Sequence, residues 1–306
     1  MAINWYPGHM KKARREIGKA MSQVDFVVEL LDARIPYSSE TPLVASLRRD
    51  KPSLKILNKA DLADPAVTKL WLAHLQRERG VKAVAMNWKE TKRIRGLMEQ
   101  GRRLLPADRN KGRPVTAMIL GVPNVGKSTM INTLRGKAVA RTGDVPAITK
   151  GQQKVKLSND LTLLDTPGFL WPRLYPAECG YRLAVTGAIR DTAIDYQDVA
   201  LFAAEFLRTR YPEATMARYK LKALPESREA LLAAVGSKRG CLQKGGVLDM
   251  HRASEVLLYE LRQGMIGPLS LETPADIPSK AEEAEEAEEA EPEATEGEEP
   301  TEAGEA

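Results

Sequence analysis

The stretch GVPNVGKS, which runs from Gly121 to Ser128, limits the possible folds of this 306-residue chain more than any other feature. It matches the GxxxxGKS pattern of a phosphate-binding loop, and it follows a strand-like apolar run and precedes a helical pattern, as that loop requires. Its glycines allow backbone N–H groups to curl around the α- and β-phosphates of a nucleotide. Lys127 would reach the β- and γ-phosphates, and Ser128 would offer its hydroxyl to Mg²⁺. The residues that we expect at the phosphates are Asn124, Val125, Gly126, Lys127, Ser128 and Thr129.

Short β-branched and apolar runs alternate with longer helical patterns before Trp171, which indicates an α/β fold with a parallel sheet and crossover helices. We expect strands at residues 25–31, 54–57, 83–86, 115–120, 153–157 and 161–164. Helices are expected at residues 11–23, 65–78, 91–105 and 127–134. The stretch PADRNKGRP, residues 106–114, has the composition of a linker between two halves of the sheet.

A second motif, LLDTPG at residues 163–168, lies beyond one more expected strand after the phosphate loop. Asp165 stands at the end of an apolar strand, where its carboxylate would hold Mg²⁺ through a water molecule. The N–H of Gly168 can contact the γ-phosphate and would sense its loss. Lys127 and Gly168 are therefore candidates for the groups that act on the transferred phosphate.

The motif NKAD, Asn58 to Asp61, directly follows the apolar run LKIL and predicts which base is bound. A carboxylate such as that of Asp61 can accept two hydrogen bonds from guanine N1 and N2, whereas adenine offers no matching pair of donors. A site of that kind typically rejects the wrong base by about 10⁴-fold. We therefore expect GTP and GDP as ligands, with Asn58, Lys59 and Asp61 at the base.

The order of these motifs is unusual, because NKAD precedes the phosphate loop, whereas in ordinary GTPases it follows that loop. The order resembles that of the circularly permuted GTPases. A permutation preserves the sheet when the original termini lie close together and are joined by a linker, which residues 106–114 can supply. It also places whatever follows DTPG directly after the segment that moves on hydrolysis.

The pattern changes after Trp171, because strand-like runs disappear and helices with apolar stripes take over. The stripe of the first long helix consists of Val199, Phe202, Phe206 and Leu207. Pro212 marks the end of this helix, and Asp249 can cap a later one. We expect a circularly permuted P-loop GTPase domain at residues 1–172, a smaller all-α domain at 173–279 and a disordered acidic tail at 280–306.

The net charge of +5 hides a strong asymmetry. Residues 280–306 hold 13 Glu and 1 Lys, whereas residues 1–172 hold 31 basic and 15 acidic residues. Residues 173–279 are nearly neutral, with 14 basic and 13 acidic residues. The basic excess gathers at residues 11–19 and 82–113. It suits a phosphate-rich partner, although an ordinary hydrophilic surface is the alternative.

The two cysteines, Cys179 and Cys241, stand in no CxxC or Cys/His pattern, so we expect neither a disulfide nor a zinc site. The chain contains no run of about 18 uncharged apolar residues, and its N-terminus passes from an aromatic cluster into charge. We therefore expect a cytoplasmic protein that does not bind a membrane. We also expect it to be monomeric.

Taken together, the motifs resemble those of the ribosome biogenesis GTPase A family, also called the YlqF or RbgA group. The resemblance covers residues 3–272 and is carried by WYPGHM, LDARIP, NKAD, GVPNVGKS, DTPGFLWP, LAVTGAIRD and KRGCLQKGG. It implies a bacterial or organellar factor that hydrolyses GTP during late assembly of the large (50S) ribosomal subunit. It also implies that the helical domain contacts ribosomal RNA, which the near-neutral composition of that region does not show.

Two segments depart from the family pattern. The loop RTGDVPAITKG, residues 141–151, has Ala147 where the family often has Gly, but it retains Thr149 to meet Mg²⁺. The segment AMNW, residues 85–88, lacks the Ser-Ala that backs the base in many GTPases, which leaves Asn87 as its candidate contact.

The group that would activate water is not at the usual position. Phe169 follows DTPG where Ras-like enzymes carry the Gln that orients the attacking water, and Val125 in the phosphate loop is also apolar. The resemblance points to His9, whose neutral imidazole could position water, although the aromatic N-terminal segment could instead pack on the sheet. Resemblance to cation-dependent GTPases implies that Asn124 helps to bind K⁺, which would stand in for an arginine finger.

Three functions remain open on the sequence alone. The first is a ribosome assembly GTPase that is slow by itself and is stimulated by the large subunit. The second is a nucleotide-gated RNA- or protein-binding switch in which hydrolysis is secondary. The third, a GTPase of tRNA modification, is disfavoured because no cysteine-based or other second chemistry is visible.

Overall fold

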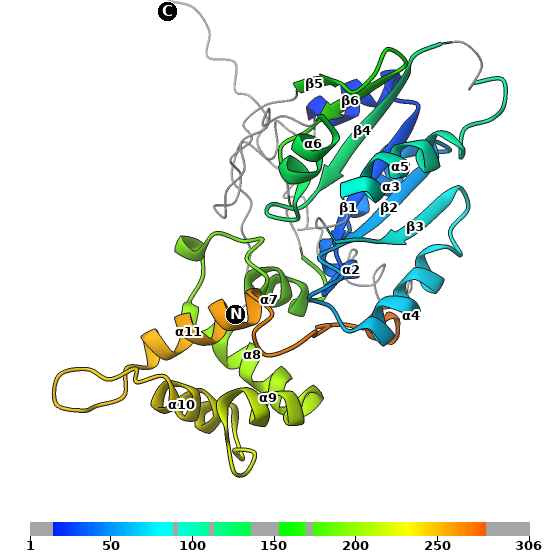
Figure 1. The fold of residues 1–306 in the computed structure, drawn as a ribbon. Coiled ribbons are helices and arrows are strands. Elements are labelled where there is room, and N and C mark those ends of the chain that lie inside the picture. Colours follow the sequence, from blue (N-terminus) through cyan, green and yellow to red (C-terminus); the bar gives the residue numbers. More distant parts are fainter. Residues whose placement is uncertain are drawn as a thin grey trace, which may run out of the picture.

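The structure is a computed structural model that describes residues 15–87, 91–109, 113–135, 153–168, 170 and 174–279. In this part of the chain, one six-stranded sheet has the order β3-β2-β1-β4-β6-β5 (Figure 1). The strands are β1 (Phe26–Asp32), β2 (Ser53–Asn58), β3 (Val81–Ala85), β4 (Val115–Gly121), β5 (Gln153–Lys156) and β6 (Leu161–Asp165). The predicted strands are all present, which confirms the α/β fold. At one edge, β5 runs antiparallel to β6, while the other neighbours are parallel.

The sheet brings the permuted motifs together. The phosphate-loop strand β4 lies in the middle and pairs in parallel with β1 on one side and with β6 on the other. Next to β1 lies β2, whose last residue is the Asn of NKAD. The first residue of DTPG is likewise the last residue of β6. Because the carboxyl ends of parallel strands meet at one edge of a sheet, the three motifs gather at the same edge.

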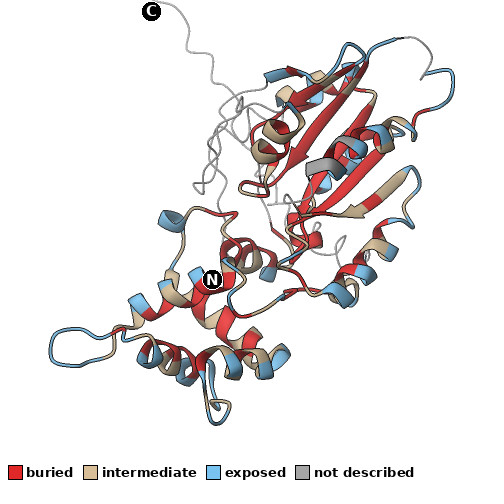
Figure 2. Ribbon diagram, viewed as in Figure 1, coloured by how far each residue is buried: buried red, intermediate tan, exposed pale blue. Residues whose placement is uncertain are grey.

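The central strands are buried along almost their whole length, as expected for a parallel sheet that helices cover on both faces (Figure 2). The helices around it are α2 (Pro36–Ser39), α3 (Pro42–Arg48), α4 (Pro65–Leu75), α5 (Thr91–Arg102) and α6 (Lys127–Arg135). Residues 15–20 are also helical. The sequence predicts α4, α5 and α6 in place. It does not predict α2 and α3, because helices of 4 and 7 residues are too short to show a periodic apolar pattern.

After DTPG, the described chain adds no strand to the sheet and continues as helices. We call them the helical part: α7 (Glu178–Val185), α8 (Tyr196–Arg210), α9 (Pro212–Tyr219), α10 (Arg228–Lys238) and α11 (Met250–Arg262). Asp249 caps α11 as predicted, because its carboxylate accepts a hydrogen bond from the Arg252 N–H. Pro212 ends α8 as predicted, and it also begins α9.

The core of the helical part forms around α8, which packs against α10 and α11. The buried residues of α8 are Val199, Ala200, Ala203, Ala204 and Leu207. Two members of the predicted stripe, Phe202 and Phe206, are only partly buried beside this core. The alanines occupy the centre because small side chains allow neighbouring helices to approach closely, and an apolar stripe defined by large residues misses them.

Among the described residues, packing between helices joins the helical part to the sheet part on two sides. On one side, α7 packs against α2. On the other, the chain turns back after α11 and runs to α4, where the short helix η3 (Pro274–Asp276) packs (Figure 1). The chain therefore leaves the sheet after DTPG and returns to it near the helix that follows NKAD.

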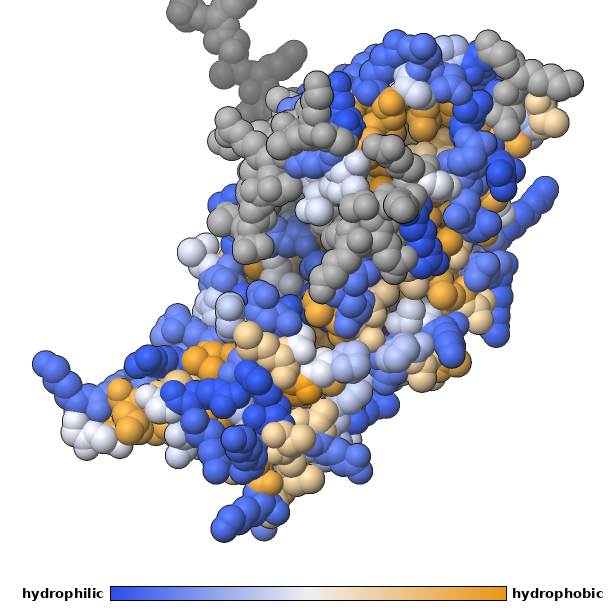
Figure 3. All heavy atoms as spheres, in the orientation of Figure 1, coloured by the Kyte–Doolittle hydropathy of each residue, from blue (hydrophilic) through white to orange (hydrophobic). Residues whose placement is uncertain are grey.

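The face shown in Figure 3 is mainly hydrophilic, with smaller hydrophobic areas on both parts. The exposed large hydrophobic side chains among the described residues are Leu70, Leu242, Val247, Tyr259 and Met265. Within the same residues, no helix combines the length and the apolar character needed to span a membrane. The predicted acidic tail, residues 280–306, lies outside the described residues.

Candidate nucleotide site

The phosphate loop joins β4 to α6 through a sharp turn. Gly121 and Gly126 have positive φ angles of 151° and 105°, and Asn124 has a φ of 56°. A Cβ atom on Gly121 would lie 2.5 Å from the backbone oxygen of Leu30 on β1, so glycine is required for the two strands to pair this closely. The loop ends at the N-terminus of α6, where backbone N–H groups and the helix dipole favour an anion.

Lys127, the first residue of α6, is buried against the loop. Its Nζ donates hydrogen bonds to the backbone oxygens of Gly121 at 2.7 Å and Val122 at 2.9 Å. Burial lowers the pKa of this ammonium group to about 8, although the Asp165 carboxylate opposes the shift. Burial also raises the pKa of Asp165 to about 6, with Lys127 opposing. A phosphate beside Lys127 and a cation beside Asp165 would each favour the charged form that burial disfavours.

The DTPG segment lies directly against the phosphate loop. Thr166 Oγ1 donates to a backbone oxygen of β4 at 2.8 Å, which fixes the segment as it leaves β6. Gly168 is buried, and a Cβ atom there would lie 2.9 Å from Pro123 Cα and 3.0 Å from Lys127 Nζ. The backbone expected to contact the γ-phosphate thus lies next to the ammonium group expected at the same phosphate.

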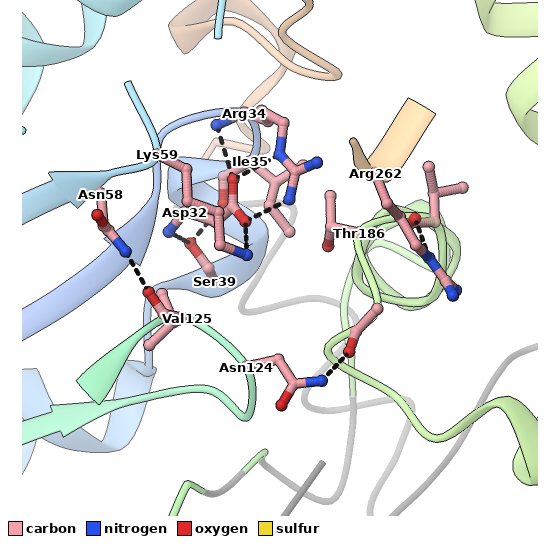
Figure 4. Close-up of polar contacts among 12 residues, drawn as sticks. Asp32, Arg34, Ile35, Ser39, Asn58, Lys59, Asn124, Val125, Thr186 and Arg262 are labelled. Carbon is pink, nitrogen blue, oxygen red and sulfur yellow. Dashed lines mark hydrogen bonds and ion pairs between the residues drawn. The ribbon is translucent and has the colours of Figure 1, made fainter. Parts of the chain in front are cut away.

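NKAD reaches the phosphate loop from the other half of the chain. Asn58 Nδ2 donates to the backbone oxygen of Val125 at 2.6 Å, so the first residue of the base motif holds the phosphate loop (Figure 4). Lys59 follows with a positive φ of 59°, and its Nζ donates to Asp32 Oδ2 at 3.0 Å. Asp61 is exposed in the turn, as a carboxylate that meets an incoming base must be.

Asp32, the last residue of β1, organises the base side of the site. Besides Lys59, it accepts hydrogen bonds from Arg34 Nε at 2.9 Å and Nη2 at 2.7 Å. Burial favours the neutral acid, but the charges of Arg34 and Lys59 outweigh it and hold the pKa of Asp32 well below its usual range. The sequence marks LDARIP only as a family motif. The sequence does contain a signal that could have placed Asp32 beside NKAD. Asp32 is a carboxylate at the end of a predicted strand, and that strand neighbours β2 in the sheet.

Asn124 points from the phosphate loop toward the helical part (Figure 4). Its Nδ2 donates to the backbone oxygen of Gly187, just after α7, at 2.9 Å. The end of α7 is held in turn by Arg262 of α11, which donates to the backbone oxygens of Ala184 at 2.8 Å and Val185 at 3.0 Å. Because the amide nitrogen of Asn124 faces Gly187, the amide oxygen, which is the atom able to ligate K⁺, lies at the other end of the group.

The remaining predicted site residues fall into two groups. Ser128 and Thr129 are half-buried in the first turn of α6, and Asn87 is half-buried just after β3. His9 and Thr149 lie outside the described residues. The structure therefore brings the phosphate, DTPG and base motifs to one edge of the sheet. The roles predicted for the individual site residues stay predictions.

The donors beside the loop fit Mg²⁺. Ser128 would supply a hydroxyl and Asp165 a carboxylate, and Mg²⁺ prefers oxygen ligands. Among the described residues, no group of three or more His, Cys, Asp or Glu gathers that could hold a metal. Magnesium at this loop would therefore depend on water and nucleotide phosphates for its other ligands, which is its usual arrangement in nucleotide-dependent enzymes.

Known proteins resemble this chain over most of its length. Residues 116–231 match the family described as "50S ribosome-binding GTPase". "Ribosome biogenesis GTPase A" of Bacillus pumilus is 44% identical over 281 residues, which cover 90% of this chain and 99% of that protein. Its namesake in Priestia megaterium is 44% identical over 284 residues, covering 90% and 98%. Among solved structures, GNP-bound YlqF from T. maritima is 30% identical with a TM-score of 0.63, covering 87% of this chain and 100% of that chain.

Replacing Gly168 by Ala is expected to slow the hydrolysis of GTP strongly. The added Cβ would meet the Pro123 backbone, which cannot move aside easily, and would crowd the Lys127 ammonium group. We expect turnover to fall by about 100-fold or more, which is typical for the loss of one preorganised donor to a developing charge. Binding of GDP, which lacks the γ-phosphate, should change by less than about tenfold. Phosphate release and GDP titration measure the two effects.

Gly96→Ala is the matched control, because a Cβ at this position of α5 meets no atom within 4 Å. It should leave turnover and GDP binding unchanged. Normal hydrolysis by Gly168→Ala would contradict the assignment of this backbone to the γ-phosphate.

Proposed function

The chain belongs to the ribosome biogenesis GTPase A family, and on that premise we propose that it binds and hydrolyses GTP as a factor for late assembly of the large (50S) ribosomal subunit. The observation that carries the proposal is the hydrogen bond from Asn58 to Val125, which joins the guanine motif to the phosphate loop. The family description that matches residues 116–231 supports the ribosomal partner. We further propose that the protein acts in the cytoplasm as a monomer.

Guanine recognition would rest on the loop that carries Asp61. This carboxylate is exposed, while its neighbours are fixed, Asn58 by the phosphate loop and Lys59 by Asp32. A carboxylate on a fixed backbone can accept hydrogen bonds from guanine N1 and N2 without a large loss of conformational entropy on binding. The buried pair of Asp32 and Arg34 keeps Lys59 in place beside it.

Changing Asp61 to Asn should weaken the binding of GTP and strengthen the binding of xanthosine triphosphate. An amide offers a donor as well as an acceptor, which suits the second carbonyl oxygen of xanthine and not the amino group of guanine. Titration with the three nucleotides measures the change, and the unmodified protein should prefer GTP to ATP by about 10⁴-fold. Asp50→Asn, at an exposed position after α3, is the control. Binding of ATP within about tenfold of GTP would contradict the base assignment.

Hydrolysis would rest on groups that hold the γ-phosphate and its cation. We propose that Lys127 and the Gly168 N–H contact this phosphate, and that His9 positions the attacking water. The proposed ligands of Mg²⁺ are Ser128, Thr149 and Asp165. Bound magnesium would neutralise the charge that develops on the phosphate oxygens. The ammonium group of Lys127 is already directed to the loop by the backbone oxygens of Gly121 and Val122.

Potassium is proposed to assist hydrolysis at Asn124. The hydrogen bond to Gly187 orients this amide, and the position after DTPG holds Phe169 in place of a water-orienting Gln. We expect K⁺ to accelerate GTP turnover over Na⁺ at matched ionic strength by on the order of tenfold, as a cation beside the developing charge should. Asn124→Gly removes the amide but tolerates the positive φ, so the difference between the salts should disappear. Equal rates for the unmodified protein would leave His9 or the ribosome as the source of catalysis.

We also propose that nucleotide state controls ribosome binding through the helical part, which would contact ribosomal RNA. The chain passes from Gly168 to the start of α7 at Glu178, and Asn124 contacts Gly187, two residues beyond the end of that helix. Loss of the γ-phosphate contact can therefore change the placement of the helical part without an intermediary.

The form bound to a non-hydrolysable GTP analogue should bind 50S subunits more tightly than the GDP form, by about 1–3 kcal/mol, a typical coupling energy. Co-sedimentation at two salt concentrations measures this. Higher salt should weaken 50S binding by both forms and leave the ratio of their two affinities in place. The reason is that the basic residues of 82–113 would contribute to the binding of both forms. Subunits of 30S type are the control. Equal binding of the two forms would contradict the coupling, and preferential 30S binding would contradict the proposed partner.

A further inference from the structure

Residues 269–272, which we call the strap, return from α11 toward α4 (Figure 1, orange). They bond to residues 58–64, the loop that carries Asp61, which we call the guanine loop. The strap has neither helical nor strand structure, yet its four residues are buried. A buried segment without regular structure must find partners for its backbone polar groups elsewhere. The strap finds them in the guanine loop, in Tyr211 of the helical part, in Trp71 of α4 and in the backbone oxygen of Arg34.

Two hydrogen bonds join the strap to the guanine loop. The Leu269 N–H donates to the backbone oxygen of Leu62 at 2.9 Å. The Asp64 N–H donates to Ser270 Oγ at 3.2 Å. Because Leu62 and Asp64 closely follow Asp61 in the chain, the strap fixes the loop on the C-terminal side of the carboxylate that would meet guanine.

The other side of the same loop is fixed by different partners. Asn58 Nδ2 donates to the backbone oxygen of Val125, and the Ala60 N–H donates to the backbone oxygen of Met86 at 3.1 Å. The phosphate loop and the end of β3 thus hold one side of the loop, and the strap holds the other. Asp61 lies exposed between these two supports.

A hydroxyl of the helical part holds the strap in turn. Tyr211, between α8 and α9, accepts a hydrogen bond from the Ser270 N–H at 3.0 Å and donates one to the Ser270 backbone oxygen at 3.2 Å. Burial raises the pKa of Tyr211, so its hydroxyl stays protonated and able to donate. Ser270 is therefore bonded to the helical part through its backbone and to the guanine loop through its side chain.

Glu272 anchors the end of the strap independently of Ser270. Its Oε1 accepts a hydrogen bond from the Ser38 N–H at 3.0 Å, and Arg182 Nη1 lies 3.4 Å from Oε2. Its backbone oxygen accepts one from Trp71 Nε1 at 3.1 Å. With these anchors on α2, α7 and α4, the strap should keep its path when a single hydroxyl near Ser270 is removed.

We propose that Ser270 and Tyr211 are positioning residues for guanine recognition, through which the helical part sets the geometry of the loop that carries Asp61. The inference rests on the proposed role of Asp61 as the guanine acceptor. A loop held on both sides presents its carboxylate ready to bind, whereas a loop held on one side must lose motion when guanine binds. Contacts to the base do not change between ground state and transition state, so weakening them raises KM and leaves kcat unchanged.

Tyr211→Phe and Ser270→Ala, each in the full chain, test this by steady-state GTP hydrolysis. We expect KM to rise by on the order of three- to tenfold with kcat unchanged, in line with the loss of one or two net hydrogen bonds. Ser270→Thr keeps a hydroxyl and should restore KM. Ser254→Ala is the matched control, because it removes a buried hydroxyl within α11 that donates to the Met250 backbone oxygen, and it should leave KM unchanged.

Three outcomes decide the matter. Unchanged KM in both variants, with melting temperatures like that of the unmodified protein, would overturn the inference. A fall in kcat without a rise in KM, or an equal effect of Ser254→Ala, would assign the hydroxyls to general stability and overturn it as well. The nucleotide preference of the unmodified protein distinguishes failure of this inference from failure of the proposed function. If that protein does not prefer GTP to ATP, the proposed role of Asp61 itself is wrong.

Discussion

The parallel pairing of β1 with β4 is the interaction on which the rest of the structure depends, because it joins the two halves of a chain whose motifs are permuted. The register sets Leu30 opposite Gly121, so the end of β1 lies against the start of the phosphate loop. Gly121 makes this possible, since any larger residue would meet the Leu30 backbone oxygen. With that register fixed, β2 lies on the far side of β1 from β4. Asn58 at the end of β2 can then donate to the backbone oxygen of Val125 in the phosphate loop.

The buried charges of the site are of two kinds. Asp32 is satisfied within the protein, because Arg34 and Lys59 stabilise its charge strongly enough to outweigh burial. Lys127 and Asp165 are not satisfied in this way, since burial dominates both and moves their pKa values to about 8 and about 6. Charges that are buried but poorly compensated are typical of functional sites, where a ligand supplies the missing partner. The first kind would therefore maintain the shape of the base side, and the second kind would leave the phosphate side dependent on nucleotide and cation.

Patterns that are local in the chain could be predicted from the sequence, and contacts between distant segments could not. The six strands follow from apolar runs, and the phosphate loop and NKAD follow from motifs that dictate their own chemistry. The strap carries no such signal, because a buried segment without periodicity resembles any loop. Its contact from Ser270 to Asp64 spans 206 positions, and that from Trp71 to Glu272 spans 201. Gly187, which receives the Asn124 amide, is likewise an ordinary helix-ending glycine until the fold brings it to the phosphate loop.

The helical part contacts the phosphate end of the nucleotide site directly and the base end through the strap, and the two contacts have different consequences. At the phosphate end, Asn124 contacts Gly187 beside the backbone that would sense the γ-phosphate, so movement there would affect GTP and GDP unequally. At the base end, the strap holds a loop that both nucleotides would use alike, so movement there would change both affinities by the same factor. A partner that displaces the helical part would therefore change the discrimination between GTP and GDP at the first end and the affinity for both nucleotides at the second. Since Arg262 ties α11 to the end of α7 while the strap continues from α11, the same helix connects the two ends.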